Sequence, residues 1–300
     1  MSGDSRGYVT LACGRRRYLE MAVDMALSLR EHSPLPVALV ADETLGAYAR
    51  EHYRGVFHSV AELPHRFRVE RAAKYGVVEA SPFEEGIFID ADCLIVSDPD
   101  GFWERLDGQG VALVGEMLGW EDDRTHHGFS TRTLMEEFGL ERYLKSNSGV
   151  FYFRRSAALP IMEECLVCYR EEVLVRLRGW LLGDELAFGV VGGRRGLGLF
   201  PLPGPMYWRP ELAAMVPGRF PKPVCHMIGP VARGALKFLL QEVDRRRKEA
   251  GLPAGSARYW KREQRKVKWG RWFDALMAPL LPAAVLLGLQ RPRTEPRTGG

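Results

Sequence analysis

Two aspartates one residue apart, Asp90 and Asp92, follow an apolar run in the stretch GIFIDADCLIVSDPD at residues 86–100. In open α/β sheets, ligands gather beyond the carboxyl ends of the strands, so these carboxylates begin where a ligand would sit. If the backbone stays extended for two more residues, both side chains project to the same side, with Ala91 between them. Two carboxylates that close repel each other unless a cation or hydrogen-bond donors separate them. A hard divalent ion such as Mg²⁺ or Mn²⁺, completed by substrate phosphates, would satisfy the pair.

A second interpretation of the same residues needs no ion. Asp90 would cap a turn, and Asp98 and Asp100 would solvate the loop that follows. A bare pair of aspartates at this spacing is a weak motif, because it arises by chance in many proteins. Its position directly after an apolar strand favours the metal site.

The elements that must position this pair alternate between strand and helix. Residues 7–13 and 35–43 are apolar, strand-like runs, and residues 15–34 between them carry apolar side chains at helical spacing. Strand, helix and strand within some forty residues form a βαβ unit, which predicts a parallel sheet with covering helices. A helical stretch at 66–80 then leads into the strand before Asp90. The fold class is therefore α/β.

The second half continues the alternation less regularly. Strands are expected at 110–117 and 146–156, followed by a helix at 158–179. Residues 118–146 are polar, contain two adjacent histidines, and are expected to form a loop or lid. Residues 192–223 are so rich in glycine and proline that long regular elements are not expected there.

Charge is distributed unevenly along the 300 residues. Residues 251–300 hold ten Lys or Arg against three Asp or Glu, so that the overall charge of +4 leaves −3 for residues 1–250. A slightly acidic main body argues against nucleic-acid binding. We therefore divide the chain into a main domain at 1–250 and a basic tail at 251–300.

Cysteine usage and the N-terminus indicate the compartment. The five cysteines are an odd number spread through apolar stretches, and we interpret them as reduced thiols. Cys165 and Cys168 form a single C-x-x-C in a helical stretch with no second ligand pair nearby, so packing is favoured over zinc or redox chemistry. No basic segment followed by a long apolar run begins the chain. We expect a cytoplasmic protein.

At this point the sequence resembles a known family. The stretch SPFEEGIFIDADCLIV is similar to the D-x-D segment of GT-A-fold nucleotide-sugar glycosyltransferases, in particular the family-eight group that includes glycogenin and bacterial lipopolysaccharide sugar transferases. Four further stretches agree in order and spacing: YVTLACGRRRYLEMAVDMALSLREH with the nucleotide-binding strand and helix, RAAKYGVVEASPF with the basic helix, SNSGVFYFRR with the N-S-G strand, and CHMIG with the late histidine segment. The resemblance covers residues 7–235. It implies a Rossmann-like mixed sheet flanked by helices, with residues 1–250 as the catalytic domain.

The resemblance implies a metal site and a nucleoside pocket. Asp90 and Asp92 would coordinate Mn²⁺ or Mg²⁺ at the diphosphate of a sugar nucleotide, with His226 as the third ligand; the alternative for His226 is a structural histidine. The nucleoside pocket would lie at the end of the first strand, and its expected residues are Ala12, Cys13, Gly14 and Tyr18. Tyr18 could equally be a core residue of its helix.

The donor sugar and phosphates would meet a second group of residues. Arg71 and Lys74 lie at i and i+3 of the expected helix, hence on one face, where they would contact phosphate or sugar; the alternative is a solvated face. The N-S-G strand and the segment near the aspartates would add hydroxyl and backbone contacts from Ala91, Asn147, Ser148 and Gly149. A strand-entry turn is the alternative for the last three.

Two carboxylates and the late segment complete the implied site. Asp184 and Glu185 begin an expected helix, where acidic side chains also interact favourably with the helix dipole. The family has an acidic or amide pair near the anomeric carbon, so the resemblance makes these two, with Asn147, the catalytic candidates. The family's usual Lys-Pro-Trp run is missing after Gly229, and only Arg233 or Lys237 could replace its phosphate-binding lysine.

These roles together imply transfer of a hexose from a UDP-sugar to a hydroxyl acceptor, with retention at the anomeric carbon. A sugar-nucleotide nucleotidyltransferase is the second interpretation, although the glycine-rich loop that it needs after the first strand is not seen in CGRRRYLEM. A third interpretation is a non-catalytic module that binds nucleotide sugars or glycans.

The tail suggests where the acceptor is found. Residues 257–273 mix tryptophans with a cationic run, and residues 275–289 are apolar but broken by two prolines. A membrane-spanning helix needs about 20 apolar residues, so we expect 257–289 to lie on a cytoplasmic membrane face, near a lipid-linked or lipopolysaccharide acceptor. The alternatives are a helix packed on the main domain or a partner-binding tail. On the membrane interpretation, a chain ending near residue 250 would keep its activity on a soluble acceptor.

Overall fold

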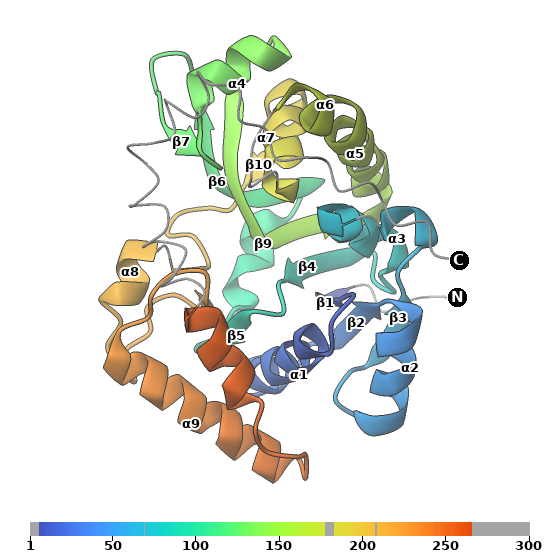
Figure 1. The fold of residues 1–300 in the computed structure, drawn as a ribbon, viewed down its shortest axis with the longest axis vertical. Coiled ribbons are helices and arrows are strands. Elements are labelled where there is room, and N and C mark those ends of the chain that lie inside the picture. Colours follow the sequence, from blue (N-terminus) through green and yellow to red (C-terminus); the bar gives the residue numbers. More distant parts are fainter. Residues whose placement is uncertain (1–5, 69, 178–182, 208, 266–300) are drawn as a thin grey trace, which may run out of the picture.

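A seven-stranded mixed sheet lies at the centre of the computed structural model, which describes residues 6–68, 70–177, 183–207 and 209–265 (Figure 1). The strand order is β10 (Gly198–Leu199), β6 (Val111–Leu118), β9 (Tyr143–Arg154), β4 (Glu85–Ile89), β1 (Arg6–Ala12), β2 (Val37–Ala41) and β3 (Ser59–Glu62). Strands β4, β1, β2 and β3 are parallel, whereas β9 runs antiparallel to both β4 and β6. The predicted α/β class with a mixed sheet is confirmed.

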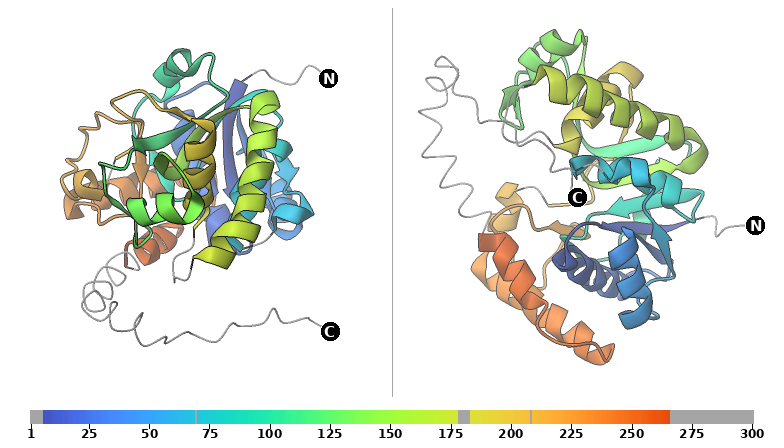
Figure 2. Two further views of the ribbon diagram at one scale, coloured as in Figure 1. Left: turned by 90° about the horizontal axis from the view of Figure 1, so that it is seen from above. Right: turned by 45° about the vertical axis from the view of Figure 1, so that its right-hand side comes forward.

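Two apolar layers cover the sheet because alternate strand residues point to opposite faces. Tyr8 and Ile87 belong to a core shared with α1 (Arg16–Arg30), α2 (Glu43–His52) and α9 (Arg233–Glu249). The neighbouring residues Val9 and Phe88 belong to a second core on the other face. Its helices are α3 (Val77–Ala80), α4 (Thr131–Phe138), α5 (Arg155–Val167) and α7 (Asp184–Arg195), as can be followed in Figure 2.

Short elements complete the described part of the chain. Strand β5 (Cys93–Ile95) pairs with β11 (Val224–His226), and β7 (Thr125–His126) pairs with β8 (Phe129–Ser130). The remaining helices are α6 (Leu174–Arg176), α8 (Arg209–Ala213), a π-helical turn at Cys168–Val173 and 3₁₀ segments at His65–Phe67, Glu70–Gly76, Asp100–Phe102 and Glu104–Leu106.

Three expected elements differ from the structure in detail. The expected helix at 66–80 is mostly 3₁₀ and ends in the single turn of α3. The expected helix at 158–179 changes to a π-helical turn after Val167. The expected loop at 118–146 contains the β7–β8 hairpin, α4 and the beginning of β9, because β9 pairs with β6 as far as Tyr143. The residue pattern of one β-strand does not reveal which strand it pairs with, because the partner strand is distant in the sequence.

The beginning of the tail packs into the main domain. Trp260 is fully buried, and its Nε1 donates a hydrogen bond to Asp24 of α1 at 2.7 Å. Arg247 of α9 binds the other oxygen of the same carboxylate. The expectation that Trp260 faces a membrane is therefore wrong, because its indole is part of the core. Residues 266–289 of the expected membrane segment lie outside the described residues.

None of the helices in the described ranges is both long and apolar enough to cross a membrane.

Candidate active site

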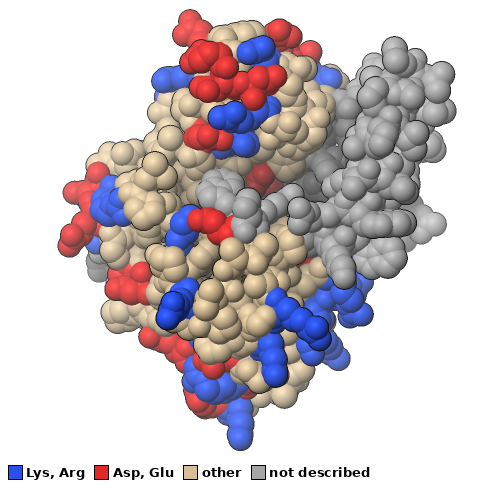
Figure 3. All heavy atoms as spheres, turned by 90° about the vertical axis from the view of Figure 1, so that its left-hand side faces the viewer, with Lys and Arg blue, Asp and Glu red and all other residues tan. Residues whose placement is uncertain are grey.

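The candidate site lies where β4 ends at the centre of the sheet. Asp90, Ala91 and Asp92 form a turn, in which the N–H of Cys93 donates to the carbonyl of Asp90 at 3.0 Å. The expected extended backbone at this point is wrong, because the chain turns at Ala91 and Asp92 before β5 begins. Asp92 nevertheless remains 31% exposed. Figure 3 shows acidic atoms in a hollow between the upper and lower parts of the molecule.

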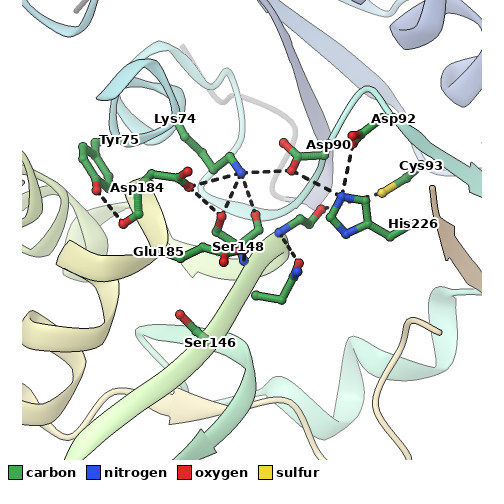
Figure 4. Close-up of polar contacts among 12 residues, drawn as sticks. Lys74, Tyr75, Asp90, Asp92, Cys93, Ser146, Ser148, Asp184, Glu185 and His226 are labelled. Carbon is green, nitrogen blue, oxygen red and sulfur yellow. Dashed lines mark hydrogen bonds and ion pairs between the residues drawn. The ribbon is translucent and has the colours of Figure 1, made fainter. Parts of the chain in front are cut away.

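The late histidine reaches the aspartates through strand pairing. β11 runs antiparallel to β5 with His226 opposite Cys93. As Figure 4 shows, Nε2 of His226 then lies 3.2 Å from Oδ1 of Asp92 and 3.8 Å from Oδ2 of Asp90. Burial alone would lower the pKa of His226, but the two carboxylates outweigh it and raise that pKa. The three residues expected to hold a metal therefore converge.

Gly149 makes room for this histidine. A Cβ atom at position 149 would lie 2.3 Å from Cε1 of His226, which is far closer than carbon atoms approach. The resemblance implied a sugar-nucleotide contact for Gly149; in the structure, the group that approaches Gly149 is the imidazole of His226.

The donor atoms at this point suit a hard divalent cation. Two carboxylates and one imidazole face one another, and such oxygen-rich sets favour Mn²⁺ or Mg²⁺. Cys93 lies beside them, but burial raises the pKa of its thiol well above the ordinary value. The thiol therefore stays protonated, with its sulfur 4.0 Å from the carbonyl of Gly149. The residues thus fit the ion that the sequence suggested.

Lys74 joins the metal-site carboxylates to the start of α7. Its ammonium lies 2.9 Å from Oδ2 of Asp90 and 3.2 Å from Oδ2 of Asp184, and it donates to Oγ of Ser148 at 2.8 Å. Burial would lower the pKa of Lys74, but Asp184 and Asp90 outweigh it and raise that pKa, so the ammonium stays charged. A phosphate contact of Lys74 stays a prediction. The side chain of Arg71 lies outside the described part of the chain.

Asp184 and Glu185 are held from β9. Oγ of Ser148 donates to Oδ2 of Asp184 at 2.6 Å, and the N–H of Ser148 donates to Oε1 of Glu185 at 3.1 Å. The hydroxyl of Tyr75 donates to the backbone carbonyl of Asp184 at 2.7 Å. Both carboxylates lie in the first turn of α7, where the helix dipole also stabilises them.

Two histidines that we did not predict as site residues contact Glu185. Nε2 of His127 lies 2.7 Å from Oε2 of Glu185, and Nε2 of His126 lies 3.6 Å from it. Burial would raise the pKa of Glu185, but the hydrogen bonds and charges of these histidines lower it well below its ordinary value. The adjacent histidines followed by Gly128 were the available sequence signal.

Asn147 is buried, and its side-chain oxygen accepts a hydrogen bond from the N–H of Gly149 at 2.9 Å. The alternative of a strand-entry turn is wrong, because Asn147 lies inside β9, next to a shift in its register with β6. Binding of a sugar hydroxyl by the remaining amide group of Asn147 stays a prediction.

The expected nucleoside residues lie at the neighbouring strand end. β1 is parallel to β4 and adjacent to it, so their carboxyl ends share one edge of the sheet. At this edge the N–H of Gly14 donates to Asp42 at 2.6 Å, and Asp42 also caps α2. Ala12 is fully buried, Cys13 is half-buried, and Tyr18 packs against the core of α1. Asp42 is a further residue of this edge that the sequence reasoning missed.

The loop after His226 is held by the tail. Nε2 of Gln264 donates to the carbonyls of Met227 and Gly229 at 3.0 Å each, and its Oε1 accepts from the N–H of Val231 at 3.0 Å. Arg233 and Lys237, the proposed phosphate contacts, are exposed on α9. Gln264 was not predicted, because its role depends on the packing of residues 251–265.

Comparison with protein-family models gives no match, and comparison with curated protein sequences gives none either. Solved glycosyltransferase structures do match. The bifunctional glycosyltransferase WbbM in its apo form aligns over 87% of this chain and 52% of its own, with a TM-score of 0.56 and 11% identity. The galactosyltransferase LgtC, solved with donor and acceptor sugar analogs, aligns over 83% of this chain and 97% of its own, with a TM-score of 0.54 and 14% identity.

The apo glycosyltransferase GlyE of Streptococcus pneumoniae aligns over 88% of this chain and 64% of its own, with a TM-score of 0.54 and 14% identity. The chain has the GT-A fold. It spans about half the length of WbbM and less than two thirds of GlyE, but nearly all of LgtC. At these identities the likeness concerns the fold, and membership of family eight within the GT-A proteins stays a prediction.

The raised pKa of Asp90 would make metal binding at this site depend on pH. Burial raises the pKa of Asp90 to about 6, although Lys74 acts in the opposite direction. A proton and a cation compete for the same carboxylate, so we expect the Mn²⁺ affinity to fall at least about tenfold from pH 7 to pH 5. In the metal-free protein the folded state binds this proton more tightly than the unfolded chain, so this group adds stability as the pH falls through 6. Calorimetric titration with MnCl₂ at three pH values measures the first effect; a constant affinity would contradict it.

Replacing Lys74 tests the charge balance of the GT-A site. Lys74→Met keeps an unbranched side chain of similar size but leaves Asp90 and Asp184 without their shared cation. Removing one partner of a mostly buried ion pair costs about 3 kcal/mol or more, and we expect that loss in urea unfolding without metal. The matched control is Lys145→Met, whose pair with Glu116 is more exposed and is worth less than about 1 kcal/mol. Equal losses in both variants would contradict the expectation.

Proposed function

We propose that this chain transfers a hexose from a UDP-sugar to a hydroxyl acceptor in a reaction that depends on a divalent cation. The observation that carries the proposal is the convergence of Asp90, Asp92 and His226 at the carboxyl edge of a GT-A sheet, beside Asp184. The GT-A glycosyltransferases that share the fold make sugar transfer the favoured chemistry. Retention at the anomeric carbon and membership of family eight are part of the same proposal.

Sugar transfer requires the protein to stabilise opposite charges on the sugar and on the diphosphate. Breaking a glycosyl–phosphate bond builds positive charge on the sugar and negative charge on the diphosphate. When bound by Asp90, Asp92 and His226, Mn²⁺ or Mg²⁺ would neutralise the leaving diphosphate. Asp184, fixed by Ser148 and Lys74, supplies negative charge and hydrogen-bond acceptors on the sugar side.

Asp42 and the backbone of Gly14 lie at the neighbouring strand end, where the nucleoside would bind. In this arrangement the nucleoside lies over β1 and the diphosphate over β4. The order follows from the parallel pairing of the two strands.

The acceptor belongs to the proposal as well. We infer that a lipid-linked or lipopolysaccharide glycan is the acceptor and that the tail attaches to the cytoplasmic face of a membrane. Because Trp260 lies in the core, the membrane segment of this proposal is reduced to residues 266–289. Sedimentation with anionic vesicles tests it: binding by the full chain that disappears when the chain ends at residue 265 supports the inference, and equal binding overturns it.

A nucleotide-release assay tests the reaction itself. The full chain is incubated with Mn²⁺ and a panel of sugar nucleotides, and free UDP is measured with and without simple sugar acceptors. UDP release that requires the cation supports the proposal. Pyrophosphate release from UTP would indicate a nucleotidyltransferase, and calorimetric binding without turnover would indicate a binding module.

A further inference from the structure

The two-residue turn between β7 and β8 places a histidine in an unusual conformation. His127 has φ of 49° and Gly128 has φ of 87°, so both central residues are left-handed. Such turns favour Asn-Gly or Gly-Gly, and a side chain such as histidine is disfavoured there. Residues in this conformation persist where surrounding contacts hold them, and they concentrate at functional sites.

The contacts of His127 define the state of its ring. Nε2 lies 2.7 Å from Oε2 of Glu185, whose pKa is well below the ordinary value, so the carboxylate is ionised and Nε2 carries the hydrogen. When the ring is neutral, Nδ1 is then the acceptor nitrogen, and within the described ranges no residue hydrogen-bonds to it. The side chain of His127 is 21% exposed, so this nitrogen has access to a ligand.

The neighbouring histidine has a different, structural role. Nδ1 of His126 lies 2.8 Å from the hydroxyl of Tyr143, and its Nε2 donates to the carbonyl of Ser146 at 3.0 Å. Both of its ring nitrogens are therefore used, and its side chain is buried. Of the two histidines, only His127 keeps a nitrogen for a substrate.

Space for the ring comes from the residue before α7. A Cβ atom at Gly183 would lie 2.9 Å from Cε1 of His127, so a side chain at that position would displace the ring. The ring is thus packed against the beginning of the helix that carries both Asp184 and Glu185. This contact keeps His127 next to the catalytic candidates.

His127 and Glu185 lie where the acceptor would bind. In Figure 4, Asp184 lies on one side of Lys74, and Asp92 and His226 lie on the other. Since the metal ligands would hold the diphosphate, the sugar would extend toward Asp184, and the acceptor would bind beside the sugar on the face that the diphosphate leaves, as retention requires. Glu185 follows Asp184 in the chain and accepts a hydrogen bond from His127, so His127 lies at the Asp184 end of the site.

We propose that Nδ1 of His127 binds the acceptor hydroxyl and receives its proton during transfer, with Glu185 as the positioning residue. The inference rests on the proposed glycosyl transfer. The acceptor oxygen forms a bond to the anomeric carbon on the face from which the diphosphate leaves, so the configuration is retained. The bond from that carbon to the diphosphate oxygen breaks, and its electron pair leaves with the diphosphate. The hydroxyl proton passes to Nδ1, and the resulting imidazolium stays hydrogen-bonded to the Glu185 carboxylate. The proton is released to water after the product leaves.

The substitution His127→Asn separates chemistry from folding. Asparagine tolerates the left-handed conformation better than histidine, so the turn is kept and the melting temperature should be unchanged or higher. General base catalysis contributes about 10²–10⁴-fold, so we expect kcat for transfer to fall at least about 100-fold. In the presence of Mn²⁺, the Kd of His127→Asn for the UDP-sugar, measured by calorimetry, should stay within twofold of the wild-type value. His65→Asn, at an exposed position, is the matched control and should transfer normally.

A second variant tests the positioning residue. Glu185→Gln keeps a side-chain oxygen for His127 but removes the charge that stabilises the imidazolium, so a smaller loss of kcat than in His127→Asn is expected, again with unchanged donor binding. Transfer by His127→Asn at the wild-type rate would overturn the inference. The inference would also be overturned if His127→Asn lost both donor binding and transfer. If the wild-type chain neither binds nor turns over any sugar nucleotide, the proposed function itself fails.

Discussion

Asp92→Asn is expected to reduce sugar transfer by at least about 100-fold. Changing a residue that only supports a metal ligand costs about 10–100-fold, so the loss of a charged ligand should cost more. The substitution keeps the shape of the side chain and one oxygen, but it removes the negative charge that faces His226. Because Asp92 is 31% exposed, the fold should tolerate the change.

Metal binding distinguishes this explanation from a general defect. Calorimetry should show that the affinity of Asp92→Asn for Mn²⁺ falls in parallel with its UDP release, while its melting temperature without metal stays near that of wild type. The matched control is Asp244→Asn, which removes an exposed carboxylate on α9 and should behave as wild type. A fully active Asp92→Asn variant would exclude the proposed metal site.

A chain that ends at residue 250 is expected to be severely destabilised, and one that ends at residue 265 is not. Removing a buried tryptophan costs about 3–5 kcal/mol, and Trp260 is fully buried. Its loss also takes one hydrogen-bond donor from the buried carboxylate of Asp24, which would keep its contact with Arg247. We therefore expect the opposite of what the sequence suggested for a chain cut near residue 250.

Urea unfolding of the two shortened chains measures the difference. The longer chain retains Gln264, which holds the loop after His226, so it should also keep the metal affinity of the full protein. The single substitution Trp260→Ala should reproduce most of the stability loss of the shorter chain. Equal stability of both shortened chains would show that residues 251–265 contribute little to the fold.

Much of the sheet could be predicted because its signals are local. The first strand, helix α1 and the second strand each carry their own pattern of apolar residues, and their parallel pairing follows from the βαβ rule. The acidic pair was found in the same way, because Asp90 follows directly on the apolar residues of β4. The turn after β4 was not found, because the apolar pattern does not reveal that β5 pairs with β11, a strand distant in the sequence.

The remaining contacts of the site depend on residues that are distant in the chain. His127 meets Glu185, Gln264 meets the carbonyl of Gly229, and Trp260 meets Asp24. A histidine, a glutamine or a tryptophan carries no local signal for such a partner, because the partner lies on a distant segment that is brought near by the packing of the fold.

The sequence by itself determined the α/β alternation, the basic tail and the acidic pair at the end of an apolar strand, because each depends on neighbouring residues. The tertiary structure decided that Lys74 lies between Asp90 and Asp184, that Gly149 makes room for His226, and that Trp260 belongs to the core. Shape and charge from separate segments meet only in the packed molecule, so these features could not be predicted from the order of residues along the chain.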